Sequence, residues 1–252
     1  MFLRRLYSVW AIFSIAIFFF IFIIPMVVCV PFRKMHKVAL TLNRIWAWCF
    51  FRLAFIPINR EWKFKLDPKQ QYILCGNHFS YLDIPALGLF PKPIKFVGKS
   101  QLGKIPLFGF MYNRIHIPVN RSSFKSRANS LAKAQEELDN GFSLGFFPEG
   151  GIKLTNYPSM VHFKDGAFRL AVQNNIPIIP ISFPDNYHVL MDDELLNIRR
   201  KKCRMIYHKP IWPNGTSDDD LKQLKDEVFR VIQSNLDDLH EATSFKSTKQ
   251  LN

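Results

Sequence analysis

The sequence predicts an α/β protein with a mostly parallel sheet flanked by helices, joined to an N-terminal helical membrane anchor. Two observations carry this prediction: short apolar runs alternate with helix-like segments from about residue 61 onward, and a long uncharged stretch precedes them. The 252 residues suffice for one domain with a real core plus an appendage. A composition that is 48% hydrophobic and 21% charged excludes a disordered, collagen-like or disulfide-scaffold chain.

Charge is unevenly distributed along the chain. The net charge is +14, and the first 60 residues hold eight basic residues, no acid and ten of the 25 phenylalanines. A basic, aromatic-rich segment of this kind favours contact with a membrane over contact with nucleic acid, so no nucleic-acid partner is expected. The four cysteines lie far apart without a C-x-x-C pair, which predicts reduced thiols and a main body on the cytoplasmic face.

The anchor begins with 27 uncharged residues between Arg5 and Arg33. A helix over Val9–Val30 would be about 33 Å long, enough to cross a hydrocarbon core of about 30 Å. No A-x-A-like site follows, so a cleaved signal peptide fits poorly. Basic residues flank both ends and Pro25 interrupts the run, which leaves the orientation and the crossing itself open.

The next segment, Val38–Ile58, has a narrow polar stripe when it is placed on a helix. The stripe consists of Thr41, Arg44, Trp48 and Arg52, and nearly every other position is apolar. This pattern favours a helix that lies in the membrane interface, with arginines near lipid phosphates. The alternative is an ordinary core helix that follows a single spanning helix.

The body alternates between predicted strands and predicted helices. The strands are expected at Tyr72–Cys75, Ile94–Val97, Ile115–Val119, Phe142–Phe147, Ile178–Phe183 and Cys203–Tyr207. Helices are expected at Arg127–Asp139, at Asp165–Asn175 and from Ser217, and the polar tail Glu241–Asn252 is expected to fray. We therefore divide the chain into an anchor (1–60), a catalytic domain (61–215) and a C-terminal amphipathic helix with its tail (216–252).

Two familiar motifs are absent or false. Gly141–Gly145 matches the G-x-S-x-G nucleophile elbow, but that motif needs a strand before the serine and a helix after it. Here a predicted helix ends before Gly141 and a strand follows, so we reject the match. The seven histidines show no metal-ligand spacing, and no metal site or cofactor is expected.

A histidine followed five positions later by an aspartate occurs twice. His78 and Asp83 come directly after a buried strand, where open α/β sheets place their ligands. His188 and Asp193 lie in the polar stretch 185–194, which we interpret as a solvated loop. A carboxylate-held imidazole can take a proton from a hydroxyl, whereas the competing interpretation is that the first pair only caps a turn and a helix.

Four blocks follow one another in order along the chain and decide between these interpretations. They are Asn77–Asp83 (NHFSYLD), Ile117–Arg121 (IPVNR), Phe146–Gly150 (FFPEG) and Ile176–Ile181 (IPIIPI), and the segment FKDGAF accompanies them at 163–168. Across residues 70–185 the chain resembles the glycerolipid acyltransferase family, which is typified by 1-acylglycerol-3-phosphate acyltransferases. Four blocks in order are far more specific than any one alone.

The resemblance implies that His78 and Asp83 are the catalytic pair and that Arg121 with Glu149 and Gly150 binds the glycerol phosphate of the acceptor. It also implies an acyl thioester donor, either acyl-coenzyme A or acyl carrier protein, as co-substrate. This sequence departs from the usual third block, because Gly151 replaces a threonine and the basic residue, Lys153, is shifted by one place. Lys153 would act as a point charge without the planar fork of arginine.

A basic and apolar stretch near the predicted site contains Lys95, Lys99 and Lys104. This stretch is expected to form a membrane-facing surface. The alternative is that it binds phosphates of the donor or the headgroup of the acceptor. Because of this alternative, Lys99 is included among the substrate-binding candidates.

The sequence thus predicts a membrane-bound acyltransferase that converts 1-acylglycerol-3-phosphate to phosphatidate in phospholipid biosynthesis. The expected partners are membrane lipids, a lysophospholipid acceptor and the acyl donor. Two alternatives stay open at this point. One is the same chemistry on another lysolipid, which the altered third block suggests, and the other is a non-catalytic, basic membrane-binding protein.

Overall fold

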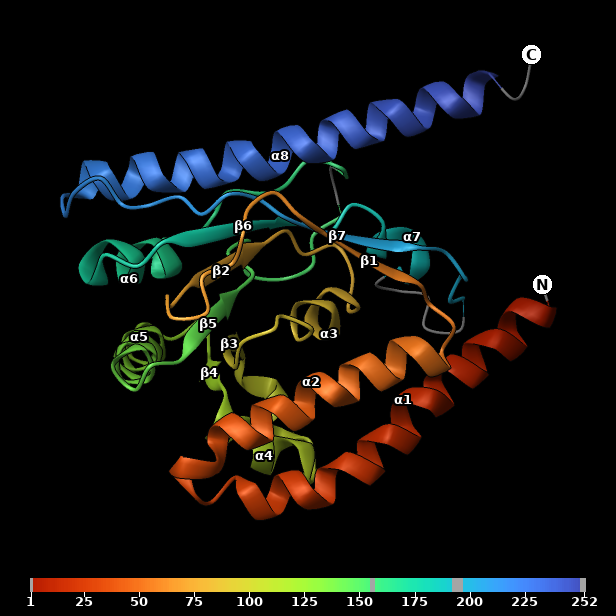
Figure 1. Cartoon of the computed structure of the whole chain (residues 1–252), viewed down its shortest axis with the longest axis horizontal. Helices are drawn as coiled ribbons and strands as arrows, with labels where there is room; N and C mark the ends of the chain where they lie inside the picture. The colour runs from red at the N-terminus through yellow and green to blue at the C-terminus, as the bar shows by residue number, and fades with distance from the viewer. Residues whose placement is uncertain (1, 155–156, 192–196, 250–252) are drawn as a thin grey trace.

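A single twisted sheet organises the body of the protein (Figure 1). The computed structural model describes residues 2–154, 157–191 and 197–249. The strands are β1 (Ile58–Trp62), β2 (Ile73–Gly76), β3 (Ile94–Lys99), β4 (Ile117–Val119), β5 (Ser143–Phe146), β6 (Ile178–Ser182) and β7 (Cys203–Tyr207), in the order β1-β7-β6-β2-β5-β3-β4. All neighbours are parallel except β6 and β7. The predicted mostly parallel α/β fold is confirmed.

Helices cover both faces of this sheet. The helices are α1 (Phe2–Cys29), α2 (His36–Leu53), α3 (Asp83–Leu87), α4 (Phe108–Ile115), α5 (Phe124–Asp139), α6 (Gly166–Asn174), α7 (Asn186–Val189) and α8 (Asp218–Lys249), with 3-10 turns η1 (Arg33–Met35) and η2 (Ser100–Lys104). α6 and α8 lie on one face, and α3 with the α1–α2 hairpin lies on the other (Figure 1).

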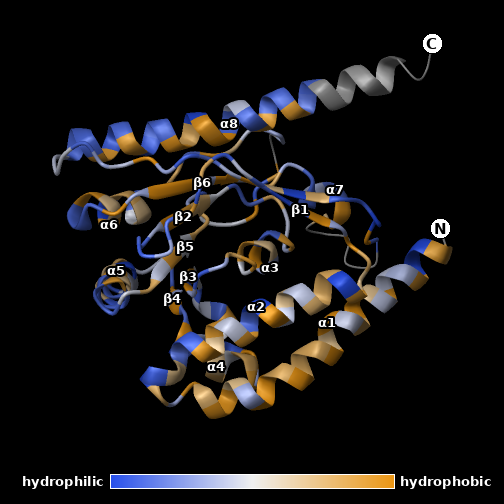
Figure 2. Cartoon of the chain, in the orientation of Figure 1, coloured by the Kyte–Doolittle hydropathy of each residue, from blue (hydrophilic) through white to orange (hydrophobic). Residues whose placement is uncertain are grey.

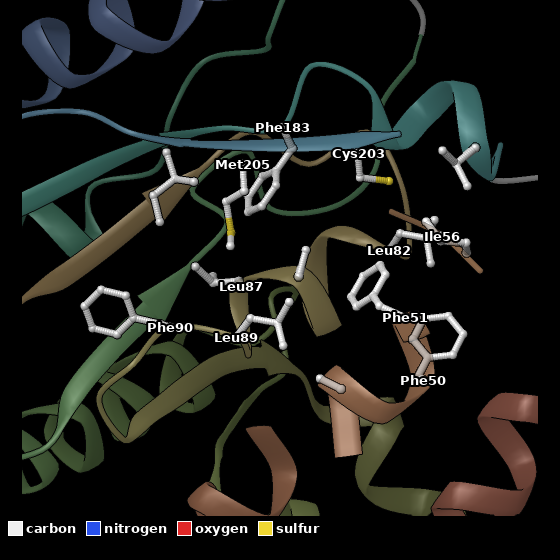
Figure 3. Close-up of a cluster of buried hydrophobic side chains, with 14 of the residues drawn as sticks. Phe50, Phe51, Ile56, Leu82, Leu87, Leu89, Phe90, Phe183, Cys203 and Met205 are labelled. Carbon is white, nitrogen blue, oxygen red and sulfur yellow. The ribbon is translucent and has the colours of Figure 1, made fainter. Parts of the chain in front are cut away.

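The central strand β2 shows how the sequence builds this arrangement. Its residues are buried without exception, as expected for a parallel strand that is covered on both sides. Because side chains alternate along a strand, Ile73 and Cys75 pack against α6 and α8, while Leu74 packs in the opposite cluster with α2 and α3. Figure 3 shows part of that second cluster, in which Phe50 and Phe51 of α2 approach Leu82.

The predicted N-terminal anchor is a helical hairpin. α1 runs without a break through Pro25, although the sequence left open whether this residue would end the helix. α1 is long and apolar enough to cross a membrane, with a mean hydropathy of 3.0 over its best window, and Figure 2 shows its hydrophobic character along most of its length. It is therefore a candidate membrane anchor.

One face of α2 packs into the body of the protein. Phe50 and Phe51 are each 2% exposed and belong to the core that also contains α3 and the sheet. This packing agrees with the alternative of a core helix on this face, and the placement of α2 in the membrane interface stays a prediction. Trp48 and Arg52 lie on the exposed side, where the arginine guanidinium sits 5.2 Å from the centre of the indole ring.

Some predicted boundaries need correction. β1 was missed because its sequence, INREW, is largely polar, and the predicted domain boundary at residues 60 and 61 falls inside this strand. Ile115 ends α4 instead of opening a strand, since β4 begins at Ile117. α8 continues to Lys249, beyond the point where fraying was expected, and its apolar stripe packs in the same core as α6.

Lys95 does not belong to the basic surface predicted for it. Its side chain is fully buried and its Nζ lies 2.7 Å from Glu137 Oε2 and 3.1 Å from His36 Nδ1. Burial lowers the pKa of Lys95, while Glu137 opposes the shift. The ion pair joins β3 to α5 within the body, and the contact of Lys95 with His36, the first residue of α2, connects the anchor hairpin to this pair. Lys104, in contrast, is exposed.

We predict that Lys95→Met lowers the free energy of unfolding by about 3–5 kcal/mol, because it leaves the Glu137 carboxylate buried without its partner. The double variant Lys95→Met/Glu137→Leu should recover most of that loss, since no buried charge remains. Denaturant unfolding in detergent checks both values. A Lys95→Met protein as stable as the wild type would contradict this account of the network.

Candidate active site

The candidate functional residues gather where parallel strands end. His78 follows β2, Lys99 ends β3, Arg121 follows β4 and Glu149 follows β5. The carboxyl ends of parallel strands meet at one edge, which is the usual place for ligands in open α/β sheets. The topology thus explains why residues from blocks far apart in sequence are neighbours.

The turn that carries His78 is clamped to the end of β6. Asn77 is fully buried, its Oδ1 accepts from Phe183 N at 2.7 Å, and its Nδ2 donates to Phe183 O at 3.2 Å. Before it, a Cβ on Gly76 would lie 2.7 Å from the ring of Phe183, so this close approach requires glycine. These contacts fix the start of the turn.

Asp83 and His78 form the pair that the sequence predicts. Asp83 Oδ2 lies 3.1 Å from His78 Nδ1 and also accepts from the backbone N–H groups of Phe79 and Ser80, at 2.9 and 2.8 Å. The His78 ring stacks on Phe147, with centroids 4.2 Å apart. Because Nδ1 faces the carboxylate, Nε2 is left for a substrate, which is the arrangement that a general base needs.

His78 lines a large apolar cavity of about 490 Å³. Its walls come from the anchor hairpin and the body together and include Ala11, Ile15, Trp46, Phe50, Leu82 and Met111. The cavity therefore lies at the junction of the α1–α2 hairpin with the sheet. An apolar space of this size beside a histidine suits a substrate with a hydrocarbon chain.

Two cations converge on the same cavity. A Cβ placed on Gly151 would lie 3.6 Å from Arg121 Nη1 and 3.9 Å from Lys99 Nζ, so both groups approach this glycine. Arg121 Nη1 is buried and has no hydrogen-bond partner among the residues described, and burial lowers the pKa of Arg121. A partly buried guanidinium that has no ion-pair partner among the described residues fits an anionic group such as phosphate.

Glu149 is placed differently from the acceptor-binding role that the resemblance implies. It is 1% exposed and does not line the cavity; its Oε1 accepts from His78 N at 2.8 Å and its Oε2 from Val161 N at 3.1 Å. Glu149 thus holds the backbone of His78 from behind. Burial raises its pKa to about 7, although these two hydrogen bonds lower it.

The rest of the third block shapes the turn around the site. Gly150 and Gly151 have φ values of 86° and 156°, in the region that favours glycine, and Gly150 packs under Lys164. Lys153 is exposed and is not part of the cavity wall. Of the predicted substrate-binding residues, the structure therefore brings Arg121, Lys99 and Gly151 together at the cavity and leaves Lys153, Glu149 and Gly150 outside it.

The second histidine–aspartate pair does not form a comparable site within the described residues. Asp193 lies outside them, while His188 is partly buried and its Nε2 lies 3.1 Å from the hydroxyl of Tyr157. The stretch 185–194 was predicted to be a solvated loop, which is wrong at its start. Asn186 is fully buried there and its Nδ2 donates to Asp83 Oδ1 at 2.8 Å. Nothing in the local sequence signals this contact.

The sequence analysis also rejected a serine-nucleophile motif and expected no metal site. The G-x-S-x-G match is rejected correctly, because α5 precedes β5 and the hydroxyl of Ser143 accepts from Tyr72 N inside the core. In the described parts of the chain, no group of three His, Cys, Asp or Glu side chains is arranged to hold a metal ion.

Comparison with known proteins finds similar sequences in one family. Residues 63–184 match the family model described as Acyltransferase. A 1-acyl-sn-glycerol-3-phosphate acyltransferase of Saccharomyces cerevisiae is 32% identical over 186 residues, which cover 71% of this chain and 60% of the relative. One of Chlamydomonas reinhardtii is 28% identical over 197 residues, which cover 77% and 57%. The chain is thus similar to members of the acyltransferase family, and the resemblance seen in its sequence blocks is confirmed.

The fold has a solved counterpart. The crystal structure of the 1-acyl-sn-glycerophosphate acyltransferase from Thermotoga maritima superposes with a TM-score of 0.74, covers 95% of both chains and is 22% identical. At that identity the likeness establishes the fold, N-terminal helices included. The chain spans about half the length of several curated relatives that it matches.

We predict that Glu149→Gln weakens the dependence of stability on pH. The folded protein keeps a proton on Glu149 up to about pH 7, whereas the unfolded chain loses it near 4.5, so ionisation of this group removes stability as the pH rises through that interval. The fall in melting temperature between pH 5 and pH 8 should be smaller in the variant. If the melting temperature falls equally in both proteins, burial does not raise the pKa of Glu149 as described.

Proposed function

We propose that this protein is an O-acyltransferase that moves a fatty acyl group from a thioester to the free hydroxyl of 1-acylglycerol-3-phosphate, with phosphatidate as product. The observation that carries the proposal is the His78–Asp83 pair, whose histidine lines an apolar cavity together with Arg121 and Lys99. One site thus offers a base, a place for a hydrocarbon chain and cations for a phosphate. The names of the relatives agree with this chemistry.

In the proposed reaction, Nε2 of neutral His78 takes the proton of the acceptor hydroxyl as the oxygen attacks the thioester carbonyl. A C–O bond forms, the C–S bond breaks, and the departing thiolate takes the proton back from His78. Asp83 stabilises the imidazolium that exists between these steps. Because the thioester is already activated, no covalent enzyme intermediate is required, and general-base help of this kind contributes about 10²–10⁴ in rate.

In this proposal the cations bind the phosphate of the acceptor, and the cavity binds a fatty acyl chain. The acceptor phosphate binds Arg121, whose partly buried guanidinium offers a planar fork, and Lys99 adds a second charge. A fatty acyl chain occupies the apolar space between α1, α2 and α3. The donor is acyl-coenzyme A or acyl carrier protein, and no further cofactor takes part.

The proposed setting is the surface of a membrane. α1 anchors the chain, and its apolar residues continue into the wall of the cavity through Ala11 and Ile15. The catalytic domain faces the cytoplasm, where the four free cysteines stay reduced. A lysolipid can then enter the site from the leaflet that holds α1.

A second acceptor class has its own supporting observation. Gly151 stands beside Arg121 and Lys99 where the family usually has a threonine, so the hydroxyl of that residue is missing at the phosphate position. A different lysolipid headgroup would meet a roomier site here. A panel of lysolipid acceptors that differ only in the headgroup decides between the two.

We predict that detergent-purified protein releases thiol from acyl-coenzyme A only when lysophosphatidate is present, and that His78→Ala abolishes this release. Binding of the variant to liposomes should be unchanged, because His78 lies inside the cavity wall. Acyl carrier protein and the lysolipid panel are tested next if coenzyme A gives no turnover. Wild-type activity in His78→Ala would remove the mechanism, and failure of every donor and acceptor would favour a non-catalytic membrane-binding protein.

We predict that Arg121→Ala raises the KM of the acceptor by at least tenfold and leaves the KM of the donor within about twofold, since a charge-assisted bidentate contact to phosphate is lost. Arg169→Ala, an arginine on α6 whose side chain is 46% exposed, is the matched control and should change neither value. Steady-state kinetics with each substrate varied in turn provide the measurement. Equal effects on both substrates would contradict the assignment of Arg121 to the acceptor.

A further inference from the structure

Asp83 accepts hydrogen bonds on both of its oxygens, and the two sides differ in origin. Oδ2 accepts from His78, Phe79 and Ser80, all within five residues of Asp83 in the same turn. Oδ1 accepts from Asn186 Nδ2 at 2.8 Å, a residue 103 positions away. Asn186 therefore holds the one carboxylate oxygen that the turn itself does not reach.

Asn186 is itself held firmly. Its neighbour Asp185 forms a two-pronged ion pair with Arg204 of β7, at 2.7 Å to Nε and 2.8 Å to Nη2. Three residues before Asn186, the backbone of Phe183 is bound on both its N–H and its carbonyl by Asn77. The turn of His78 and the segment of Asn186 are thus locked to each other, which leaves the amide little freedom to leave Asp83.

The other end of the Asn186 side chain points to a specific role. Its Oδ1 is buried and, within the described part of the chain, has no hydrogen-bond partner. An unpaired buried amide oxygen is unfavourable, and an apolar residue of similar size would avoid it. The amide is nevertheless oriented with its N–H toward the carboxylate, as the negative charge on Asp83 requires.

We infer that Asn186 is a positioning residue for the proposed transfer reaction, acting through Asp83 as the third member of a His78–Asp83–Asn186 relay of hydrogen bonds. By donating to Oδ1 it fixes the rotation of the carboxylate so that Oδ2 stays directed at His78 Nδ1. It also keeps a hydrogen-bond donor against Oδ1 while His78 carries the proton of the acceptor. The inference rests on the proposed function for its effect on rate, and its geometric part is independent of it.

Charged and titratable groups surround this relay on several elements. They are Glu149 after β5, Cys203 on β7 and the Asp185–Arg204 pair beside α7. The kcat of each Asn186 variant is therefore divided by the kcat of the wild type at every pH. The titration of these other groups then affects both proteins equally.

Two substitutions at Asn186 separate a positioning role from a merely structural one. Asn186→Leu removes the donor, and we expect kcat to fall about ten- to a hundredfold with both KM values within twofold of wild type. Asn186→Asp keeps the shape, and its carboxyl can donate to Asp83 only while the two share a proton. The ratio of its kcat to that of the wild type should be close to one at acidic pH and fall as the pH rises.

Asn129→Leu and Asn129→Asp, at an exposed position of α5, are the matched controls and should show neither effect. A second readout needs no turnover: the proton resonance of His78 Nδ1–H in protein labelled with ¹⁵N-histidine, assigned by its loss in His78→Ala. In Asn186→Leu this resonance should move upfield as the hydrogen bond to Asp83 weakens.

Each outcome has a definite meaning. A kcat of Asn186→Leu within twofold of wild type overturns the inference. If that variant does not fold, a pH-independent ratio for Asn186→Asp overturns it instead. If the wild type catalyses no transfer at all, the proposed function fails, and the resonance alone decides: a shift in either Asn186 variant upholds the relay, and an unchanged resonance removes it.

Discussion

The site depends on a carboxylate that has no contact with solvent. Asp83 is 0% exposed, and a buried charge persists only where hydrogen-bond donors or a counter-charge replace its water. Here the replacement is nearly all neutral: two backbone N–H groups, one amide and the imidazole of His78. Much of the local architecture serves to place these donors. The sharp turn after β2 places three of them, and the clamp between Asn77 and Phe183 brings the fourth.

This constraint also explains the position of Glu149. Its carboxylate accepts hydrogen bonds from the backbone N–H groups of His78 and Val161. The segment after β5 therefore supports the turn after β2 across the edge of the sheet. Glu149 belongs to one of the four sequence blocks, and in this structure its carboxylate binds the backbone of His78 on the side away from the cavity. Arg121 and Lys99, which come from the outer strands β4 and β3, are left to face the cavity. At this edge of the sheet, the residue after β5 supports His78, while the residues from β3 and β4 face the cavity.

The sequence predicted those parts of the structure that local patterns determine. The continuous apolar runs of β2 and β6 mark buried parallel strands, and the spacing of His78 and Asp83 within one turn fixes their pairing. Asn186 and Lys95 could not be predicted, because each owes its burial to a partner far away in sequence, Asp83 in one case and Glu137 in the other. A polar residue in a polar stretch gives no sign of such a partner. β1 was missed for a related reason, since an edge strand needs no apolar face on both sides.

The anchor and the active site share one wall, which links membrane attachment to the proposed chemistry. Ala11 and Ile15 of α1 line the cavity, and Trp46 and Phe50 of α2 line it as well. The buried pair Lys95–Glu137, with His36 at the start of α2, fixes this hairpin against β3 and α5. In the proposed function, a hydrocarbon chain would lie against these apolar side chains in the cavity that His78 also lines. Since exposing such a chain to water costs about 0.8 kcal/mol for each CH₂ group, these apolar walls favour binding of the chain beside His78.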